Sequence, residues 1–79
     1  MLDIRQVIRN NIKQARKTSK LTQENIGKIW GISQSQYARY ERGSIELNYS
    51  QIVSLCRILK ISPNELFGYD EVKEDFIEI

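Results

Sequence analysis

The feature that most constrains the fold is a pair of short predicted helices near the middle of the sequence. Thr22 can cap residues 23–30 through its hydroxyl group, and Gly31 follows where a left-handed residue ends a helix. Ser33 can cap a second helix in the same way, and Gly43 ends that segment. The gap between the two helices is about three residues, which is too short for an antiparallel hairpin of long helices. The sequence therefore predicts two helices that cross sharply.

A small residue is needed where the backbones of two sharply crossing helices approach each other, and Gly27 supplies it. Glycine inside a helix costs ~1 kcal/mol relative to alanine. Because Ile29 and Trp30 continue the helical pattern beyond it, Gly27 does not mark the end of the first helix. We expect Gly27 to lie at the crossing point.

The second helix of the pair has two unlike faces. At its start, Gln36 stands at the N3 position of a capping box with Ser33. At ~100° per residue, one face carries short polar side chains and arginines, namely Gln34, Ser35, Ala38, Arg39 and Arg42. The opposite face carries Tyr37, Tyr40 and Glu41. We expect this aromatic face to pack on the helices before and after it.

Apolar residues at helical spacing predict a longer helix at the beginning of the chain. It covers residues 3–18, and its stripe consists of Ile4, Ile8, Ile12 and Ala15. Strand signals are almost absent before residue 70, because β-branched residues recur at helical and not at alternating intervals. The predicted fold class is all-α.

Two further helices complete the pattern. Asn48 with Gln51 opens the fourth helix, whose apolar stripe consists of Ile52, Leu55, Cys56 and Leu59. A short fifth helix follows, with Ser62, Pro63 and Glu65 as cap, first residue and N3 acid, and with Leu66 and Phe67 as its apolar residues.

The charge is distributed unevenly along the 79 residues. Residues 1–44 carry nine basic and three acidic side chains, a net charge of +6, whereas residues 45–79 carry three basic and seven acidic ones, a net charge of −4. A basic first half of this kind suits a polyanionic partner. The acidic second half is a candidate docking surface for a protein partner.

The residue inventory argues against several classes of function. There is no histidine, and the single Cys56 lies within an apolar helical stripe, so we expect a buried thiol and neither a disulfide nor a metal site. No glycine-rich phosphate loop or acid–base cluster is present, so we expect no enzyme activity and no cofactor. No stretch is apolar enough to cross a bilayer or to act as a secretion signal, so we expect a cytoplasmic protein.

The stretch LTQENIGKIWGISQSQYARYERG, residues 21–43, resembles the helix-turn-helix of the phage repressor and Cro family, also called the XRE family. The matching positions are Leu21, Thr22, Gln23, Glu24, Ile26, Gly27, Gly31, Ile32, Ser33, Gln34, Tyr40, Glu41, Arg42 and Gly43. A weaker resemblance extends over roughly residues 4–67. Departures from the pattern are Lys20, where a glycine is common, Trp30 in place of a smaller aliphatic residue, and the missing proline near Asn48. The resemblance implies a compact five-helix bundle of the lambda-repressor-like type with a short acidic C-terminal tail.

In this family the exposed face of the third helix carries the usual base-reading residues, which correspond here to Gln34, Ser35, Ala38 and Arg39. Gln34 can form two hydrogen bonds with adenine, Arg39 can grip the O6 and N7 atoms of guanine, and Ala38 offers a methyl group to thymine. Gln23 resembles the glutamine with which the family contacts a DNA phosphate. Lys28 and Arg42 are further candidates for phosphate contacts, although each also suits simple solvation.

Arg16 and Glu41 match a pair that forms a salt bridge between the first and third helices in family members. Glu41 falls on the inward face of its helix, where a carboxylate is costly unless it is paired. We therefore expect Arg16 to orient the recognition helix.

These residues together predict a sequence-specific regulator of transcription that binds double-stranded DNA, more readily a repressor than an activator. It is expected to act as a homodimer on a palindromic site with half-sites about 34 Å apart. The alternative is a DNA-binding antitoxin or another protein-interaction module whose function depends on a partner protein. Stable association with a partner would favour this alternative.

The expected domain division is a DNA-binding domain at residues 1–68 and a C-terminal tail or dimerisation extension at residues 69–79. The extension is acidic and carries Phe76, Ile77 and Ile79, which suits a frayed tail, a helical extension or a pairing strand. The dimer interface stays open among the last two helices and the tail, with three first candidates if they are exposed: Val53, Ile58 and Leu66.

Overall fold

The computed structural model describes residues 3–69, and all five elements in this range are α-helices. They are α1 (Ile4–Thr18), α2 (Gln23–Trp30), α3 (Gln34–Arg42), α4 (Tyr49–Leu59) and α5 (Pro63–Phe67). The prediction of an all-α chain with five helices is confirmed for this part of the sequence. The acidic tail lies outside the described residues.

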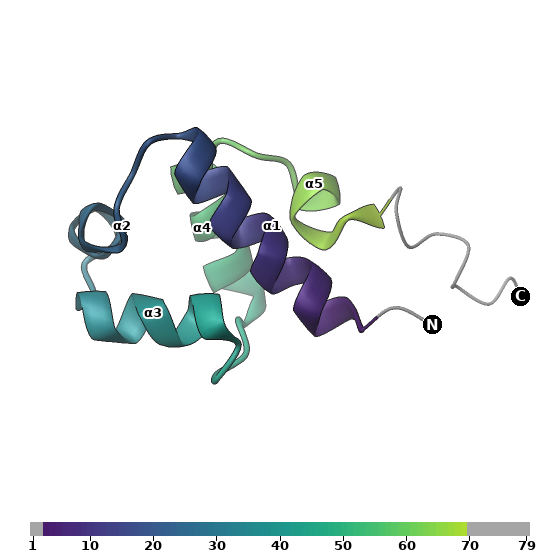
Figure 1. Ribbon diagram of the computed structural model, residues 1–79, viewed down its shortest axis with the longest axis horizontal. Coiled ribbons are helices and arrows are strands. Elements are labelled where there is room, and N and C mark those ends of the chain that lie inside the picture. The colour runs from purple at the N-terminus through teal and green to yellow at the C-terminus, as the bar shows by residue number, and fades with distance from the viewer. Residues whose placement is uncertain (1–2, 70–79) are drawn as a thin grey trace, which may run out of the picture.

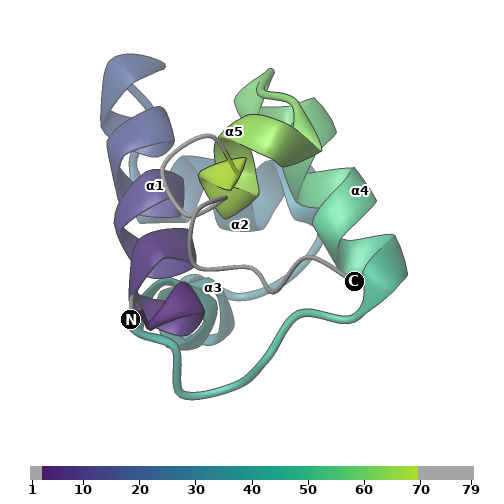
Figure 2. The ribbon, with the colours of Figure 1, turned by 90° about the vertical axis from the view of Figure 1, so that its right-hand side faces the viewer.

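Two views show how the helices enclose one core. In Figure 1, α2 is seen almost along its axis while α3 runs across the page below it, so these two helices cross steeply as predicted. Figure 2 shows α5 between α1 and α4. Every helix contributes a side chain to the buried core, which consists of Ile12, Ile26, Tyr37, Leu55, Cys56, Leu59 and Leu66. Cys56 is therefore buried, as the sequence predicted.

Side chains at the start of each helix set the observed boundaries. Asp3 accepts a hydrogen bond from the backbone N–H of Arg5, which makes Asp3 the cap and places the start of α1 one residue later than predicted. Capping boxes open α4 and α5 as predicted. In α3 only half of the predicted box forms, because Ser33 accepts from the N–H of Gln36 but the return bond is absent.

The crossing of α2 and α3 depends on Gly27. A Cβ atom at this position would lie 2.8 Å from the carbonyl oxygen of Ile32 and 3.3 Å from the backbone nitrogen of Gln34. Since both atoms belong to the backbone that leads into α3, no side-chain movement could make room. The prediction that Gly27 permits the close approach is confirmed.

A lysine takes a left-handed conformation after α1. Lys20 has φ 60°, its N–H donates to the carbonyl of Lys17, and the N–H of Leu21 donates to the carbonyl of Arg16. These two bonds form a Schellman motif, in which glycine is the usual residue at the left-handed position. The sequence departure at Lys20 therefore leaves the turn intact and places an L-residue in a costly conformation.

Replacing Lys20 with glycine is expected to raise the free energy of unfolding by about 0.5 kcal/mol. The change removes the cost of a left-handed L-residue, about 1–2 kcal/mol. Glycine also gives the unfolded chain more conformational entropy, which lowers the stability by about 0.4–1 kcal/mol. Urea denaturation measures the difference. Lys17→Gly removes the same charge inside α1 and should instead destabilise by about 1 kcal/mol; a loss of stability in both variants would contradict this explanation.

No helix between residues 3 and 69 is long and apolar enough to cross a membrane.

Candidate nucleic-acid interface

The two faces of α3 differ in exposure as the helical arithmetic predicted. Tyr37, Tyr40 and Glu41 are buried. On the opposite face, Gln34, Ser35, Arg39 and Arg42 are exposed and Ala38 is half-buried. The helix therefore presents to solvent a surface of amide, hydroxyl, methyl and guanidinium groups.

The buried face fixes α3 on its neighbours. The rings of Tyr40 and Trp30, which ends α2, lie 5.5 Å apart between centroids at a tilt of 38°. The side-chain amide of Gln51 in α4 donates a hydrogen bond of 2.7 Å to the hydroxyl of Tyr40. The expected packing of the aromatic face on the helices before and after it is confirmed, and Trp30 has a partner that suits its larger ring.

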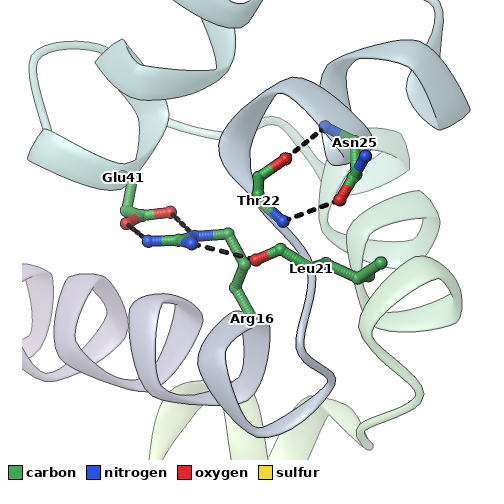
Figure 3. A network of polar contacts seen from close by, with 5 residues as sticks. All are labelled: Arg16, Leu21, Thr22, Asn25 and Glu41. Carbon is green, nitrogen blue, oxygen red and sulfur yellow. Dashed lines mark hydrogen bonds and ion pairs between the residues drawn. The ribbon is translucent and has the colours of Figure 1, made fainter.

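Arg16 and Glu41 join α1 to the last turn of α3 (Figure 3). The Nε and Nη2 atoms of Arg16 each donate to one carboxylate oxygen of Glu41, both at 2.9 Å. The remaining Nη1 atom donates to the carbonyl of Leu21 at 3.0 Å, in the loop that leads into α2. One guanidinium group thus connects α1, α3 and the start of the helix-turn-helix.

Burial and hydrogen bonding act in opposite directions on this pair. Only 5% of the Glu41 side chain and 13% of the Arg16 side chain are exposed. Burial is the largest single influence and would raise the pKa of Glu41, but the hydrogen bonds and charge of Arg16, together with contributions from Tyr37 and Gln23, hold that pKa below its ordinary value. The hydrogen bond to Glu41 raises the pKa of Arg16. Both groups are therefore charged at neutral pH.

The Tyr37 hydroxyl lies buried beside this ion pair. Its oxygen has no hydrogen-bond partner of ordinary geometry among the described residues. Burial, with a further contribution from the Glu41 carboxylate, raises the pKa of Tyr37 above its ordinary value. Tyr37 is thus a neutral core residue, as predicted, and does not reach the exposed face of α3.

The three candidate phosphate-contacting residues occupy different settings. Gln23 is the first residue of α2 and is half-buried, and its side chain helps to lower the pKa of Glu41, so its amide lies toward the ion pair. The exposed Lys28 forms an ion pair of 3.4 Å with Glu24 one turn earlier. The side chain of Arg42 is exposed at the end of α3. The three side chains thus come from the first residue of α2, the second half of α2 and the last residue of α3.

Nothing in the described range from residue 3 to residue 69 forms a group of three or more potential metal ligands. The features that the structure does bring together are the exposed face of α3, the steep crossing with α2 and the bidentate ion pair behind them.

Comparison with known proteins agrees with this arrangement. The model of the helix-turn-helix domain family matches residues 10–71. The chain is 36% identical to an HTH-type transcriptional regulator, YqaE of Bacillus subtilis, over 81% of this chain and 62% of that protein. It is 35% identical to the antitoxin PezA of Streptococcus pneumoniae over 84% of this chain and 42% of PezA, and 30% identical to a second Bacillus subtilis regulator, YobD, over 85% of this chain and 60% of YobD.

The chain thus spans between about two fifths and about three fifths of the length of these relatives. No solved structure matches it significantly. The family match covers α2 to α5 and the second half of α1, and the resemblance of residues 21–43 to the helix-turn-helix is confirmed. The chain belongs to the helix-turn-helix domain family, and within it to the XRE type of phage repressors and Cro proteins.

Proposed function

We propose that this protein regulates transcription by binding a specific site in double-stranded DNA, with α3 in the major groove. The observation that carries the proposal is the contrast between the two faces of α3. Its buried face is held in place by Tyr37, Tyr40 and the Glu41 ion pair, while its outer face carries exposed hydrogen-bonding side chains. A rigid helix with a free polar face fits the width of the major groove.

Each residue on that face has chemistry suited to a base edge. The Arg39 guanidinium can donate two hydrogen bonds to guanine, and the Gln34 amide can both donate to and accept from adenine. Ser35 can donate to or accept from several bases, and the methyl group of Ala38 can pack on the methyl group of thymine. We propose that these four residues read the site.

Phosphate contacts would hold the helix in register. Lys28 and Arg42 are exposed and basic, and Gln23 stands at the N-terminus of α2, where backbone N–H groups favour an anion. For Gln23 to reach a phosphate, its amide must turn away from the Glu41 side. We propose that all three contact the DNA backbone, and that Arg16 acts indirectly by orienting α3.

The assembly and the sense of regulation belong to the same proposal. A homodimer on a palindromic site would place two copies of α3 in successive major grooves. Repression is favoured over activation because occupying a promoter requires only binding. The proposed location is the cytoplasm, where bacterial and phage DNA is found. We further propose that residues 1–68 form the DNA-binding domain and residues 69–79 an extension.

The exposed apolar residues narrow the search for a dimer interface. In α4, Tyr49 is 90% and Val53 is 47% exposed, one turn apart. Ile58 is half-buried, and Leu66 is fully buried in the core, so Leu66 does not meet the condition of exposure on which it was a candidate. We place the interface at α4 for this reason.

Selection from a randomised duplex library tests the regulator proposal. We expect an inverted repeat whose half-site centres lie about 10 base pairs apart, bound far more tightly than random duplex. Weak binding that is independent of sequence and lost steeply with salt would contradict the proposal.

A second candidate function is that of an antitoxin that binds both DNA and a partner protein. It is favoured by the similarity to PezA and by the net charge of −4 in residues 45–79. Co-expression with the protein encoded next to it separates the two functions, because an antitoxin forms a stable complex with that neighbour and the stand-alone regulator does not.

A further inference from the structure

An apolar groove lies on the side of the molecule where α1, the loop before α4 and the end of α5 meet. Its volume is about 290 Å³, and its floor is formed by Ile8, Ile12, Leu47, Ile52, Leu66 and Phe67. A dry cavity of about 150 Å³ accommodates a benzene ring. The groove therefore has room for a phenyl ring together with an aliphatic side chain.

The rim of this groove carries more positive than negative charge. Arg5 and Arg9 line one side, and Glu46 is the acidic residue in the lining. The Arg5 side chain is 70% exposed, with Asp3 at 3.6 Å as its nearest partner. Arg9 donates one hydrogen bond of 3.3 Å to the carbonyl of Arg42. The groove thus favours a ligand that combines apolar side chains with acidic ones.

The chain itself contains a segment of this composition beyond the described residues. Residues 70–79, DEVKEDFIEI, carry five acidic side chains and one lysine, together with Val72, Phe76, Ile77 and Ile79. Phe67, three residues before this segment, belongs to the lining of the groove. Phe76 lies seven residues beyond Tyr69, the last described residue, and an extended chain of seven residues spans up to about 24 Å. Phe76 can therefore reach back to the groove.

We propose that residues 70–79 bind in this groove of their own chain, with the ring of Phe76 on the apolar floor and the neighbouring carboxylates beside Arg5 and Arg9. Attachment at the groove's edge gives the segment an effective concentration in the millimolar range, which favours its own groove over that of a second copy. This proposal does not depend on DNA binding.

Nuclear Overhauser measurements on the full chain test the proposal. We expect contacts between the ring protons of Phe76 and the methyl protons of Ile8 and Leu47. In a mixture of isotopically labelled and unlabelled chains, these contacts should occur within one chain. Their absence, or their occurrence only between two chains, would overturn the proposal; the second result would make the groove a dimer contact.

Two pairs of variants test separately the apolar and the charged contacts between residues 70–79 and the groove. Phe76→Ala should shift the methyl resonances of Ile8 and Leu47, and Val72→Ala, a matched loss in the same segment, should leave them in place. Arg5→Gln should weaken the contacts about twofold at low salt, and Lys13→Gln, a matched loss of charge on the exposed side of α1, should not. Unchanged resonances in Phe76→Ala, or equal effects of the two charge variants, would contradict the proposed binding mode.

Discussion

Replacing Arg16 with leucine is expected to lower the free energy of unfolding by about 3–5 kcal/mol. The loss arises because the carboxylate of Glu41, which is 5% exposed, would stay buried without its two hydrogen bonds from the guanidinium. The loop carbonyl of Leu21 would lose its donor as well. A domain of this size has a total stability of about 4–12 kcal/mol, so the variant should lose a large share of it.

Urea denaturation of Arg16→Leu, Glu41→Leu and the double variant measures this effect. The double variant removes the unpaired charge, so it should recover most of the stability that Arg16→Leu loses. Additive losses in the double variant would mean that the two side chains are not coupled, which would refute the role of the ion pair.

The pH dependence gives an independent check on the same pair. In the native protein the pKa of Glu41 lies below its ordinary value of 4.5, so its contribution to stability is complete above that pH and is lost as pH falls through the lowered value. In Arg16→Leu, burial without a partner raises this pKa instead. The stability difference between the two proteins should therefore shrink between about pH 7 and about pH 4. A constant difference over that range would contradict the explanation.

Replacing Gly27 with valine is expected to cost about 2–3 kcal/mol of stability. The new Cβ would lie 2.8 Å from the carbonyl oxygen of Ile32, and two further methyl groups would press on the backbone at the start of α3. Alanine should cost less, since it adds the same Cβ without the two further methyl groups, and its better helix propensity, worth ~1 kcal/mol, offsets part of the overlap. Thermal denaturation of both variants gives the order of their effects.

Lys28→Val is a matched control for the valine substitution, because it introduces the same β-branched residue at the next, exposed position of α2. It loses only helix propensity and an exposed ion pair with Glu24, together about 1 kcal/mol or less. Equal losses in Gly27→Val and Lys28→Val would show that the crossing of α2 and α3 does not depend on a missing Cβ.

The boundaries of the helices were predictable because local signals set them. Thr22 and Ser33 each cap a helix through a residue three positions later, and Gly31 and Gly43 take the left-handed conformation at the ends of α2 and α3. The left-handed Lys60 after α4 carries no such signal, since lysine usually continues a helix. The return bond of Gln36 was wrongly predicted, because its sequence position fits a capping box whether or not the side chain turns back.

The periodicity of the sequence does not predict contacts between distant parts of the chain. The side-chain amide of Asn11 donates to the carbonyls of Glu65 and Leu66, which fastens α5 to α1 across more than fifty residues. The hydrogen bond between Gln51 and Tyr40 is of the same kind. Such bonds depend on how the helices are placed, and a sequence pattern shows only that an exposed or half-exposed polar residue is present.

The candidate site also has one part that the sequence predicted and one part that it did not. Helical arithmetic separated the exposed face of α3 from the buried one, because Gln34 and Arg39 on one side and Tyr37 on the other follow from 100° per residue. The position of the Gln23 side chain near Glu41 could not be predicted from the sequence, because it depends on how α2 and α3 cross.

Affinity measurements with Arg39→Ala on the selected duplex and on single base-pair variants of it test base reading by α3 most directly. We predict a loss of about 1–3 kcal/mol of binding free energy on the selected site, with preference relaxed at one base pair of each half-site and an unchanged response elsewhere. Arg57→Ala, which removes the same charge from an exposed position on α4, should leave the preference at that base pair intact. If Arg39→Ala instead weakens binding equally on every duplex, as Arg57→Ala would, α3 does not read bases through Arg39 and the central claim is wrong.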